Sequence, residues 1–278
     1  MKFTKMHGLG NDYVYINGFE EKLYDPAAVS IAVSDRHFGI GADGLIMILP
    51  SEVADVRMRM FNADGSEGQM CGNGIRCVAK YSFDHGLTQA NPMRVETLAG
   101  IKTIDLQLNE EGKVASATVD MGEPILEGKK IPSTIDEPKV VDYAVEANGE
   151  TYNITLVSMG NPHAIIYTDN CEAVELEKIG AVLETLPEFP ERMNVHFVQV
   201  HSPAELTMRT WERGSGITLA CGTGASAVCV AGVLNNKNDR ETLIHLPGGD
   251  LNIRWDEASN HVFMTGTATE VFTGIWGD

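Results

Sequence analysis

The feature that most constrains the fold of this chain is an internal repeat at a fixed offset of 150 residues. Cys71 begins the stretch CGNGIRCVAKY, and Cys221, 150 positions later, begins CGTGASAVCVAG. The same offset aligns further groups without a gap: Gly10-Asn11 with Gly160-Asn161, Met58-Arg59 with Met208-Arg209, and Val78 with Val228. A repeat of this kind indicates two similar structural units within one chain.

Each half also has the same expected order of elements. A strand near Gly-Asn is followed by a helix, two strands, and a helix that begins at Cys-Gly-X-Gly. The helix-like run 25–36 aligns with 175–186, and the strand-like run 45–49 aligns with 195–199. Residues 55–61 alternate as a half-buried strand does. The sequence therefore predicts an α+β fold of two pseudo-symmetric domains, each a curved, mainly antiparallel, barrel-like sheet around a central helix.

Turn signals and composition set the expected domain boundaries. Hairpins are predicted with turns at 109–112 and near 256–260. Residues 225–234 are apolar on every side, which is typical of a helix inside a domain. The expected organisation is a first domain over 1–122, a proline-containing linker over 123–140, a second domain over 141–267, and a last strand at 268–278 that joins the first domain.

Composition excludes several classes of function. The 278 residues carry a formal net charge of −18, and such an acidic surface repels nucleic-acid phosphates and anionic lipids. The chain has no bilayer-length apolar run and its start lacks the features of a signal peptide, so we expect a cytoplasmic protein. Its five cysteines do not form a disulfide framework, and the spacings of six and eight residues between neighbours do not match a zinc motif.

The paired Cys-Gly-X-Gly motifs suggest a specific chemistry. Glycines permit a sharp turn and the close approach of a ligand. The first turn of a helix carries unpaired N–H groups and a partial positive charge, which lower a cysteine pKa and bind a carboxylate. Two such helices would point at one cleft and present two thiols around one anion site. Inversion of a stereocentre beside a carboxylate needs such a base and acid on opposite faces of the carbon.

The chain resembles the diaminopimelate epimerase family, which is independent of pyridoxal phosphate. The resemblance covers essentially the whole chain and rests on five motifs in order: MHGLGNDYVYI, NADGSEGQMCGNGIRC, VETLAG, SMGNPHAI and WERGSGITLACGTGASA. It implies interconversion of LL- and meso-diaminopimelate on the route to lysine and, in bacteria, cell-wall precursors. It also implies a homodimer, no cofactor, no metal, and an active site in the cleft between the domains.

The resemblance assigns roles to individual residues. Cys71 takes the α-proton from the L-configured centre, and Cys221 supplies a proton from the other face. The remaining roles follow the family motifs: backbone amides of Gly72, Asn73, Gly222 and Thr223 for the reacting carboxylate, Asn11 and Glu212 for the α-amino group, Asn62, Asn161, Asn194 and Arg213 for the distal end, and His163 with Glu212 for tuning the cysteines.

The residue types alone leave other interpretations open. Asn11 and Asn161 could simply be turn residues, and His163 could be a hydrogen-bonded histidine of the core. Glu212 and Arg213 could form a surface ion pair. The chain also departs from many family members, which carry Gln where it has Gly44. Because Gly44 aligns with Asn194, a side-chain contact there is expected in one half only.

Three other functions compete with this interpretation. Related epimerases or dehydratases that act on proline or hydroxyproline tend to carry His where this chain has Asn73, and they lack the counterpart of Arg213. A thiol redox switch would pair Cys71 with Cys221. A carboxylate-binding module would need the helix ends but neither sulfur.

Overall fold

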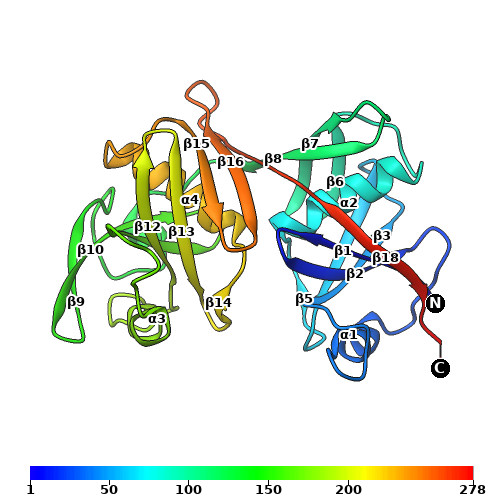
Figure 1. Ribbon diagram of the computed structural model, residues 1–278, viewed down its shortest axis with the longest axis horizontal. Coiled ribbons are helices and arrows are strands. Elements are labelled where there is room, and N and C mark those ends of the chain that lie inside the picture. Colours follow the sequence, from blue (N-terminus) through cyan, green and yellow to red (C-terminus); the bar gives the residue numbers. More distant parts are fainter. Residues whose placement is uncertain (278) are drawn as a thin grey trace. The chain divides into compact units, whose positions relative to one another are not determined.

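The computed structural model describes residues 1–277, and the chain divides into two compact units (Figure 1). The first unit comprises Met1–Asp120 and the chain from Thr265 onward, and the second comprises Met121–Met264. The chain passes between the units within β8 (Val114–Gly122) and within β17 (Val262–Gly266). Among the described residues, no helix has both the length and the apolar character needed to cross a membrane.

The first unit contains two helices, α1 (Pro26–Ser34) and α2 (Gly72–Asp84), within its described residues. Besides parts of β8 and β17, its strands are β1 (Lys2–Gly8), β2 (Asn11–Asn17), β3 (Gly44–Leu49), β4 (Val56–Asn62), β5 (Glu67–Gly68), β6 (Met93–Thr97), β7 (Gly100–Leu108) and β18 (Thr269–Ile275). They form one sheet in which β18, β1, β2, β3, β4, β6, β7 and β8 are successive neighbours.

The second unit contains the α-helices α3 (Leu176–Glu184) and α4 (Gly222–Leu234) and the short 3-10 helix η1 (Gly128–Lys130). Its strands are β9 (Tyr143–Ala147), β10 (Glu150–Ser158), β11 (Pro162–Tyr167), β12 (Asn194–Ser202), β13 (Glu205–Glu212), β14 (Gly216–Thr218), β15 (Glu241–Leu246) and β16 (Gly249–Trp255). The order β9, β10, β11, β12, β13, β15, β16 repeats the arrangement of the first unit.

The 150-residue offset extends to the pairing register of the strands. Tyr13 lies opposite Gly44 in the parallel pair of β2 and β3, and His163 lies opposite Asn194 in the pair of β11 and β12. The helices obey the same offset, since α3 and α4 begin and end 150 residues after α1 and α2. The predicted α+β fold of two pseudo-symmetric domains is therefore confirmed.

Parallel pairing explains why each unit needs its helices. Parallel neighbours require a crossover connection, which is usually a helix. The helix α1 connects β2 to β3 and α2 connects β4 to β6, while α3 and α4 make the equivalent connections in the second unit. The helices α2 and α4 pack against several strands of their own sheets and form the predicted central helices (Figure 1).

The buried faces of the strands follow from their sequences. In β3 every residue but the last is buried, because Leu45 and Met47 join the cluster that contains Val33 of α1, whereas Ile46 faces α2 at Gly74. The next strand, β4, buries Met58 and Met60 and leaves the alternating Arg57 and Arg59 partly exposed, as its alternation predicted. The central helix α4 is buried through most of its length, which confirms the expectation for 225–234.

Two expectations about connecting segments have different outcomes. The segment 123–140, expected as a linker, packs inside the second unit, where Ile131, Ile135 and Val140 are buried in its core. That expectation was wrong because these apolar residues have no regular spacing and give no periodic signal. The last strand-like segment does return to the first unit, where β18 pairs antiparallel with β1.

Candidate active site

Each Cys-Gly-X-Gly motif places its cysteine at the entrance of a central helix. Cys71 caps α2 with φ −130° and ψ 118°, and Cys221 caps α4 with φ −129° and ψ 100°. In both motifs the cysteine carbonyl accepts the first helical hydrogen bond, at 2.9 Å from Ile75 N and from Ala225 N. Both cysteines are therefore N-cap residues beside the first-turn N–H groups, whose partial positive charge favours an anion.

The second glycine of each motif serves packing rather than a sharp turn. Gly74 and Gly224 are regular helical residues. A Cβ at Gly74 would lie 2.7 Å from Ile46 Cδ1, and one at Gly224 would lie 2.4 Å from His196 Cε1. We expected these glycines to permit a sharp turn. At these two positions glycine is needed instead because the helix packs closely against the adjacent strand.

Cys71 is half-buried and held from two sides. Its Sγ accepts from Gly74 N–H at 3.3 Å and contacts Asn11 Oδ1 at 3.3 Å. Asn11 is itself oriented by Asp43, since its Nδ2 donates to Asp43 Oδ2 at 2.8 Å. Asn11 is therefore not only a turn residue, because its side-chain amide contacts the Cys71 sulfur and is held in place by Asp43.

A buried arginine lies one helical turn beyond Cys71. The Arg76 side chain is fully buried and donates to Gly72 O, to Asn73 Oδ1 and to Thr267 O, each at 3.2 Å. Burial lowers the pKa of the Arg76 guanidinium, and interaction with the anionic forms of Cys77 and Cys71 opposes that shift. Because arginine stays protonated in proteins, Arg76 is a permanent positive charge in the first turns of α2, close to Cys71.

The surroundings of Cys221 are electrostatically different. Only 4% of the residue is exposed, and burial followed by the negative charge of Glu212 raises the pKa of the Cys221 thiol well above its usual value. The Glu212 carboxylate accepts from the Thr218 hydroxyl at 2.6 Å, which orients it. The expectation that the helix end lowers the pKa of both cysteines is wrong for Cys221, because the cost of burying a thiolate exceeds the stabilisation by the helix.

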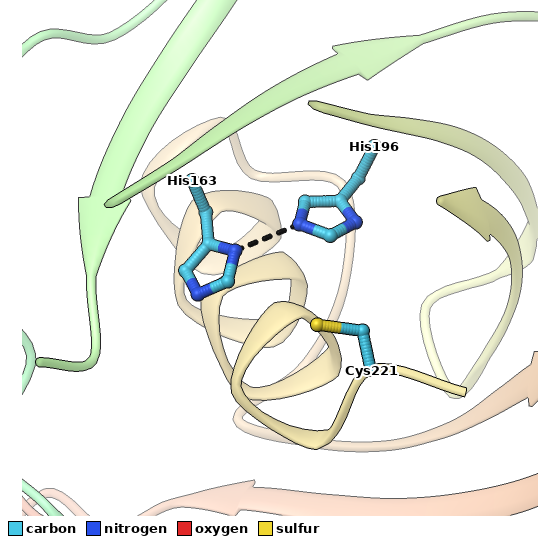
Figure 2. A group of neighbouring side chains, drawn as sticks. All are labelled: His163, His196 and Cys221. Atoms are coloured by element: carbon cyan, nitrogen blue, oxygen red, sulfur yellow. Dashed lines mark hydrogen bonds between the residues drawn. The ribbon is translucent and has the colours of Figure 1, made fainter. Parts of the chain in front are cut away.

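Two imidazoles lie next to Cys221 (Figure 2). His163 Nδ1 and His196 Nε2 are 2.8 Å apart, His163 Nε2 lies 3.1 Å from Asn161 Oδ1, and His196 Nδ1 lies 3.0 Å from Thr210 Oγ1. Because the Asn161 oxygen only accepts, His163 carries its proton on Nε2 and receives the His196 Nε2–H on Nδ1. The Thr210 hydroxyl then donates to His196 Nδ1, which completes a directed chain.

Both imidazoles are neutral at pH 7. They are fully buried, and burial is the largest cause that lowers the pKa of each, to about 3 for His196. The pKa of His163 is lowered well below its usual value, first by burial and then by the charges of His196 and Arg213. His163 is therefore a hydrogen-bonded buried histidine that also lies within reach of the Cys221 sulfur.

Comparison with known proteins identifies the family of this site. The family description "Diaminopimelate epimerase" matches residues 3–127 and 155–271. The chain belongs to the diaminopimelate epimerase family. Two relatives called diaminopimelate epimerase are similar over nearly their whole length. The protein of Acetivibrio thermocellus is 56% identical over 99% of this chain and 98% of its own, and that of Methanococcus maripaludis is 53% identical over 99% of each.

Solved structures of lower identity share the fold of this diaminopimelate epimerase family member. A phenazine biosynthesis protein of the PhzF family from Bacillus anthracis matches with a TM-score of 0.71 at 18% identity, over 99% of this chain and 98% of its own. A probable proline racemase from Agrobacterium radiobacter matches with a TM-score of 0.68 at 15% identity, over 99% of this chain and 92% of its own. The proline-specific alternative thus shares the architecture, whereas the family match favours the epimerase.

The residues assigned to the distal substrate end by the epimerase family occupy different environments. Asn194 is buried, and its amide bridges two segments by accepting from Arg213 N–H at 2.9 Å and donating to Pro162 O at 2.8 Å. The Arg213 side chain is exposed and donates to Glu191 O at 3.0 Å. In the first unit, Asn62 donates to Ser66 Oγ at 2.9 Å. Asn194 thus holds the backbone of Arg213 in place, while the Arg213 guanidinium is exposed to solvent.

The departure at Gly44 has a steric cause in this epimerase. A Cβ at Gly44 would lie 2.1 Å from Phe61 O and 2.9 Å from the Tyr13 ring. No side chain fits at this position of β3. The hydrogen bond that Asn194 makes to Arg213 N in the second unit is made in the first unit by the backbone, since Asp43 O accepts from Ala63 N at 3.0 Å.

Sequence reasoning missed two residues at the epimerase caps. Arg76 interrupts the apolar run after Cys71, and His196 lies within the strand-like run 195–199. The available signal for Arg76 was a charged residue inside an otherwise apolar run. The signal for His196 was its alignment, at the 150-residue offset, with the apolar residue Ile46. All five cysteines are free thiols, so the two cap cysteines are not joined by a disulfide.

Proposed function

We propose that this protein is a cytoplasmic, cofactor-independent diaminopimelate epimerase that interconverts the LL and meso isomers by proton transfer at one α-carbon. The observation that carries the proposal is the pair of cysteines that cap equivalent helices of two pseudo-symmetric units, in a chain that belongs to this family. The proposed product supplies lysine synthesis and, in bacteria, the cell wall.

The reaction needs two groups on opposite faces of the α-carbon. In the LL-to-meso direction, the Cys71 thiolate takes the α-proton, and the electron pair of the broken C–H bond moves toward the carboxylate. The Cys221 thiol then donates its proton to the opposite face of the same carbon. The cycle leaves Cys71 as a thiol and Cys221 as a thiolate, and the reverse reaction uses them in these exchanged roles.

The direction of this assignment is supported by the charges around each sulfur. Arg76 places a buried positive charge near Cys71, which favours its thiolate. Burial and Glu212 favour the thiol form of Cys221. The resting enzyme therefore has its base at Cys71 and its acid at Cys221, as the LL-to-meso direction requires.

Helix ends supply the proposed stabilisation of developing charge. Removal of the α-proton puts negative charge on the carboxylate oxygens, and backbone N–H groups at a helix N-terminus stabilise such charge. We assign this role to the amides of Gly72 and Asn73 in α2 and of Gly222 and Thr223 in α4. The side chain of Asn73 is fixed by Arg76, which steadies this end of α2.

Polar side chains around the caps complete the proposed substrate site. Asn11, in contact with the Cys71 sulfur, and Glu212, which interacts with Cys221, hold the α-amino group. The exposed Arg213 guanidinium grips the distal carboxylate in bidentate fashion, and Asn62, Asn161 and Asn194 line the distal end. His163 and Glu212 adjust the proton affinity of Cys221.

The substrate assignment is tested with dialysed enzyme and three candidate substrates. We expect LL-diaminopimelate to be converted to the meso isomer without any added cofactor, and L-proline and trans-4-hydroxy-L-proline to remain unchanged. Arg213→Ala should lower kcat/KM for diaminopimelate by at least about tenfold, because a bidentate contact to a charged group is lost, with little change in the unfolding midpoint. Full activity of this variant, or turnover of proline, would overturn the assignment.

A homodimer is the proposed assembly. Its support is the cluster of exposed apolar side chains on β18, where Val271, Phe272 and Ile275 are 54%, 48% and 78% exposed. Apolar side chains gathered on one strand are typical of an interaction surface. We assign this strand to the contact between two copies of the chain.

A further inference from the structure

We propose that His163, His196 and Cys221 form a binding site for a zinc-like divalent ion, and that an ion held there inhibits the enzyme. Binding of the ion depends only on the geometry of the second unit. The loss of activity rests on the proposed role of Cys221 as the acid. The ion is thus an inhibitor at this site and takes no part in the reaction.

The three side chains converge from separate elements of the second unit. His163 lies on β11, His196 on β12, and Cys221 at the N-cap of α4, and all three are buried (Figure 2). One possible ligand atom from each lies within 4.8 Å of the others. A tetrahedral zinc site has Zn–N near 2.0 Å and Zn–S near 2.3 Å, so two nitrogens and one sulfur around the ion are about 3.3–3.5 Å apart. Small side-chain movements therefore suffice to close the site.

The hydrogen-bond partners behind the imidazoles suit metal ligation once the His196 proton has moved to Nδ1. A ligating histidine almost always donates its other ring N–H to a fixed acceptor. His163 Nε2 is held by Asn161 Oδ1 and His196 Nδ1 by Thr210 Oγ1, which leaves Nδ1 of His163 and Nε2 of His196 facing each other at 2.8 Å. These two nitrogens are the proposed ligand atoms.

The proton balance of binding is simple. His163 Nδ1 offers its lone pair directly. His196 moves its proton from Nε2 to Nδ1, and Thr210 rotates its hydroxyl so that its oxygen accepts a hydrogen bond from the new Nδ1–H. Cys221 releases its thiol proton to solvent and binds as thiolate. One proton is therefore released for each ion bound.

Gly224 keeps the space between sulfur and imidazole open. A Cβ built on Gly224 would lie 2.8 Å from His196 Nε2 and 3.1 Å from Cys221 Sγ. The sulfur and the ring nitrogen therefore converge on the same small volume beside the helix. Thiolate with imidazole selects zinc, cobalt or copper over magnesium or calcium.

The first unit provides an internal comparison. The counterparts of His163 and His196 at the 150-residue offset are Tyr13 and Ile46, which offer no imidazole. Cys71 has Asn11 and Gly74 N–H as its contacts instead. The site is therefore specific to Cys221, although the two helix caps share their backbone geometry.

Cobalt(II) is the probe for binding, because its thiolate complexes absorb in the near ultraviolet. We expect the metal-free protein, titrated with Co²⁺ in oxygen-free buffer, to develop a thiolate-to-cobalt charge-transfer band that Zn²⁺ abolishes. Cys71→Ala should keep the band, whereas Cys221→Ala should lose it completely. His196→Ile, which copies the first unit, should weaken Co²⁺ binding at least about tenfold. Circular dichroism checks that each variant is folded.

The outcomes separate the two proposals. Absence of the band in the wild-type protein, its survival in Cys221→Ala, or its loss in Cys71→Ala would each overturn the metal site. A parallel assay measures epimerisation of LL-diaminopimelate with Zn²⁺ and then with excess EDTA, and we expect inhibition that EDTA reverses. A metal-free protein with the cobalt band but without turnover would contradict the proposed function and leave the metal site supported.

Discussion

Cys71 and Cys221 occupy equivalent helix caps, yet the side chains around them carry opposite charges. Arg76 brings a buried positive charge to Cys71, while its counterpart in the second unit is Ser226, which donates to Gly222 O at 3.0 Å. Glu212 brings a negative charge to Cys221. In the proposed mechanism the shared backbone supplies the anion site, and the differing side chains decide which sulfur is the base.

Replacing Arg76 tests this difference. Arg76→Gln should shift the pH profile of Cys71 alkylation by iodoacetamide upward by about one unit, because a nearby positive charge favours a thiolate. The kcat/KM for LL-diaminopimelate at pH 7 should fall about tenfold. Ser226→Ala is the matched control at the equivalent position, and it should leave the alkylation profile unchanged. An unshifted profile in Arg76→Gln would contradict the electrostatic role.

The buried histidine pair predicts how stability depends on pH. In the unfolded chain each imidazole takes up a proton below pH 6.5, whereas in the native protein His196 stays neutral down to about pH 3. The unfolded state then binds more protons, so stability falls as the pH falls, by about 1.4 kcal/mol per pH unit for each histidine.

The measurement compares urea unfolding at pH 7 and pH 5. In His196→Gln the slope of unfolding free energy against pH should be smaller by the contribution of one histidine. This holds whatever the substitution does to the stability at pH 7. His201→Gln, at an exposed position, is the control and should keep the full wild-type slope. Equal slopes in wild-type protein and His196→Gln would show that the pair does not resist protonation.

The central helices differ in how tightly they meet the neighbouring strand. A Cβ at Gly224 collides with the rigid His196 ring at 2.4 Å, whereas a Cβ at Gly74 meets the flexible end of Ile46 at 2.7 Å. Gly224→Ala should therefore lower the free energy of unfolding by about 2 kcal/mol. Gly74→Ala should cost less, because Ile46 can move and alanine favours the helix. Chemical denaturation measures both, and an equal or larger loss for Gly74→Ala would contradict this packing account.

Much of the element order could be predicted from the sequence, for a physical reason. The hydrophobic patterns of strands and helices are local, and the repeat provides each pattern twice, so β3, β4 and α2 were expected near their observed positions and again 150 residues later. The segment 123–140 was misassigned because Ile131, Ile135 and Val140 are buried by residues distant in the sequence.

The finer features of the candidate site were less predictable. Arg76 reaches Thr267, which is 191 residues away, and no local pattern reports such a partner. His196 becomes informative only when β11 and β12 pair in parallel and bring it beside His163. The pKa of Cys221 depends on a competition between burial and the helix end. The direction of the resulting pKa shift cannot be found without the positions of the surrounding atoms.

The assembly of the molecule is tested through β18. Ile275→Glu should convert the proposed dimer to monomer, because a charge would be buried in an apolar contact. Val53→Glu, at a residue that is 56% exposed elsewhere in the first unit, is the control and should leave the mass unchanged. Light scattering after size-exclusion chromatography reads the mass. A monomeric wild-type protein would contradict the dimer, and a dimeric Ile275→Glu would place the contact elsewhere.

The central claim is that each half of the chain supplies one acid–base cysteine to the same carbon. The most direct measurement is the isotopic content of substrate and product early in the reaction of LL-diaminopimelate in deuterated water. The account predicts meso product with deuterium at the inverted α-carbon and unreacted LL substrate that keeps its protium. Product that retains the substrate's own proton, or substrate that exchanges as fast as product forms, would point to a single base and contradict the account.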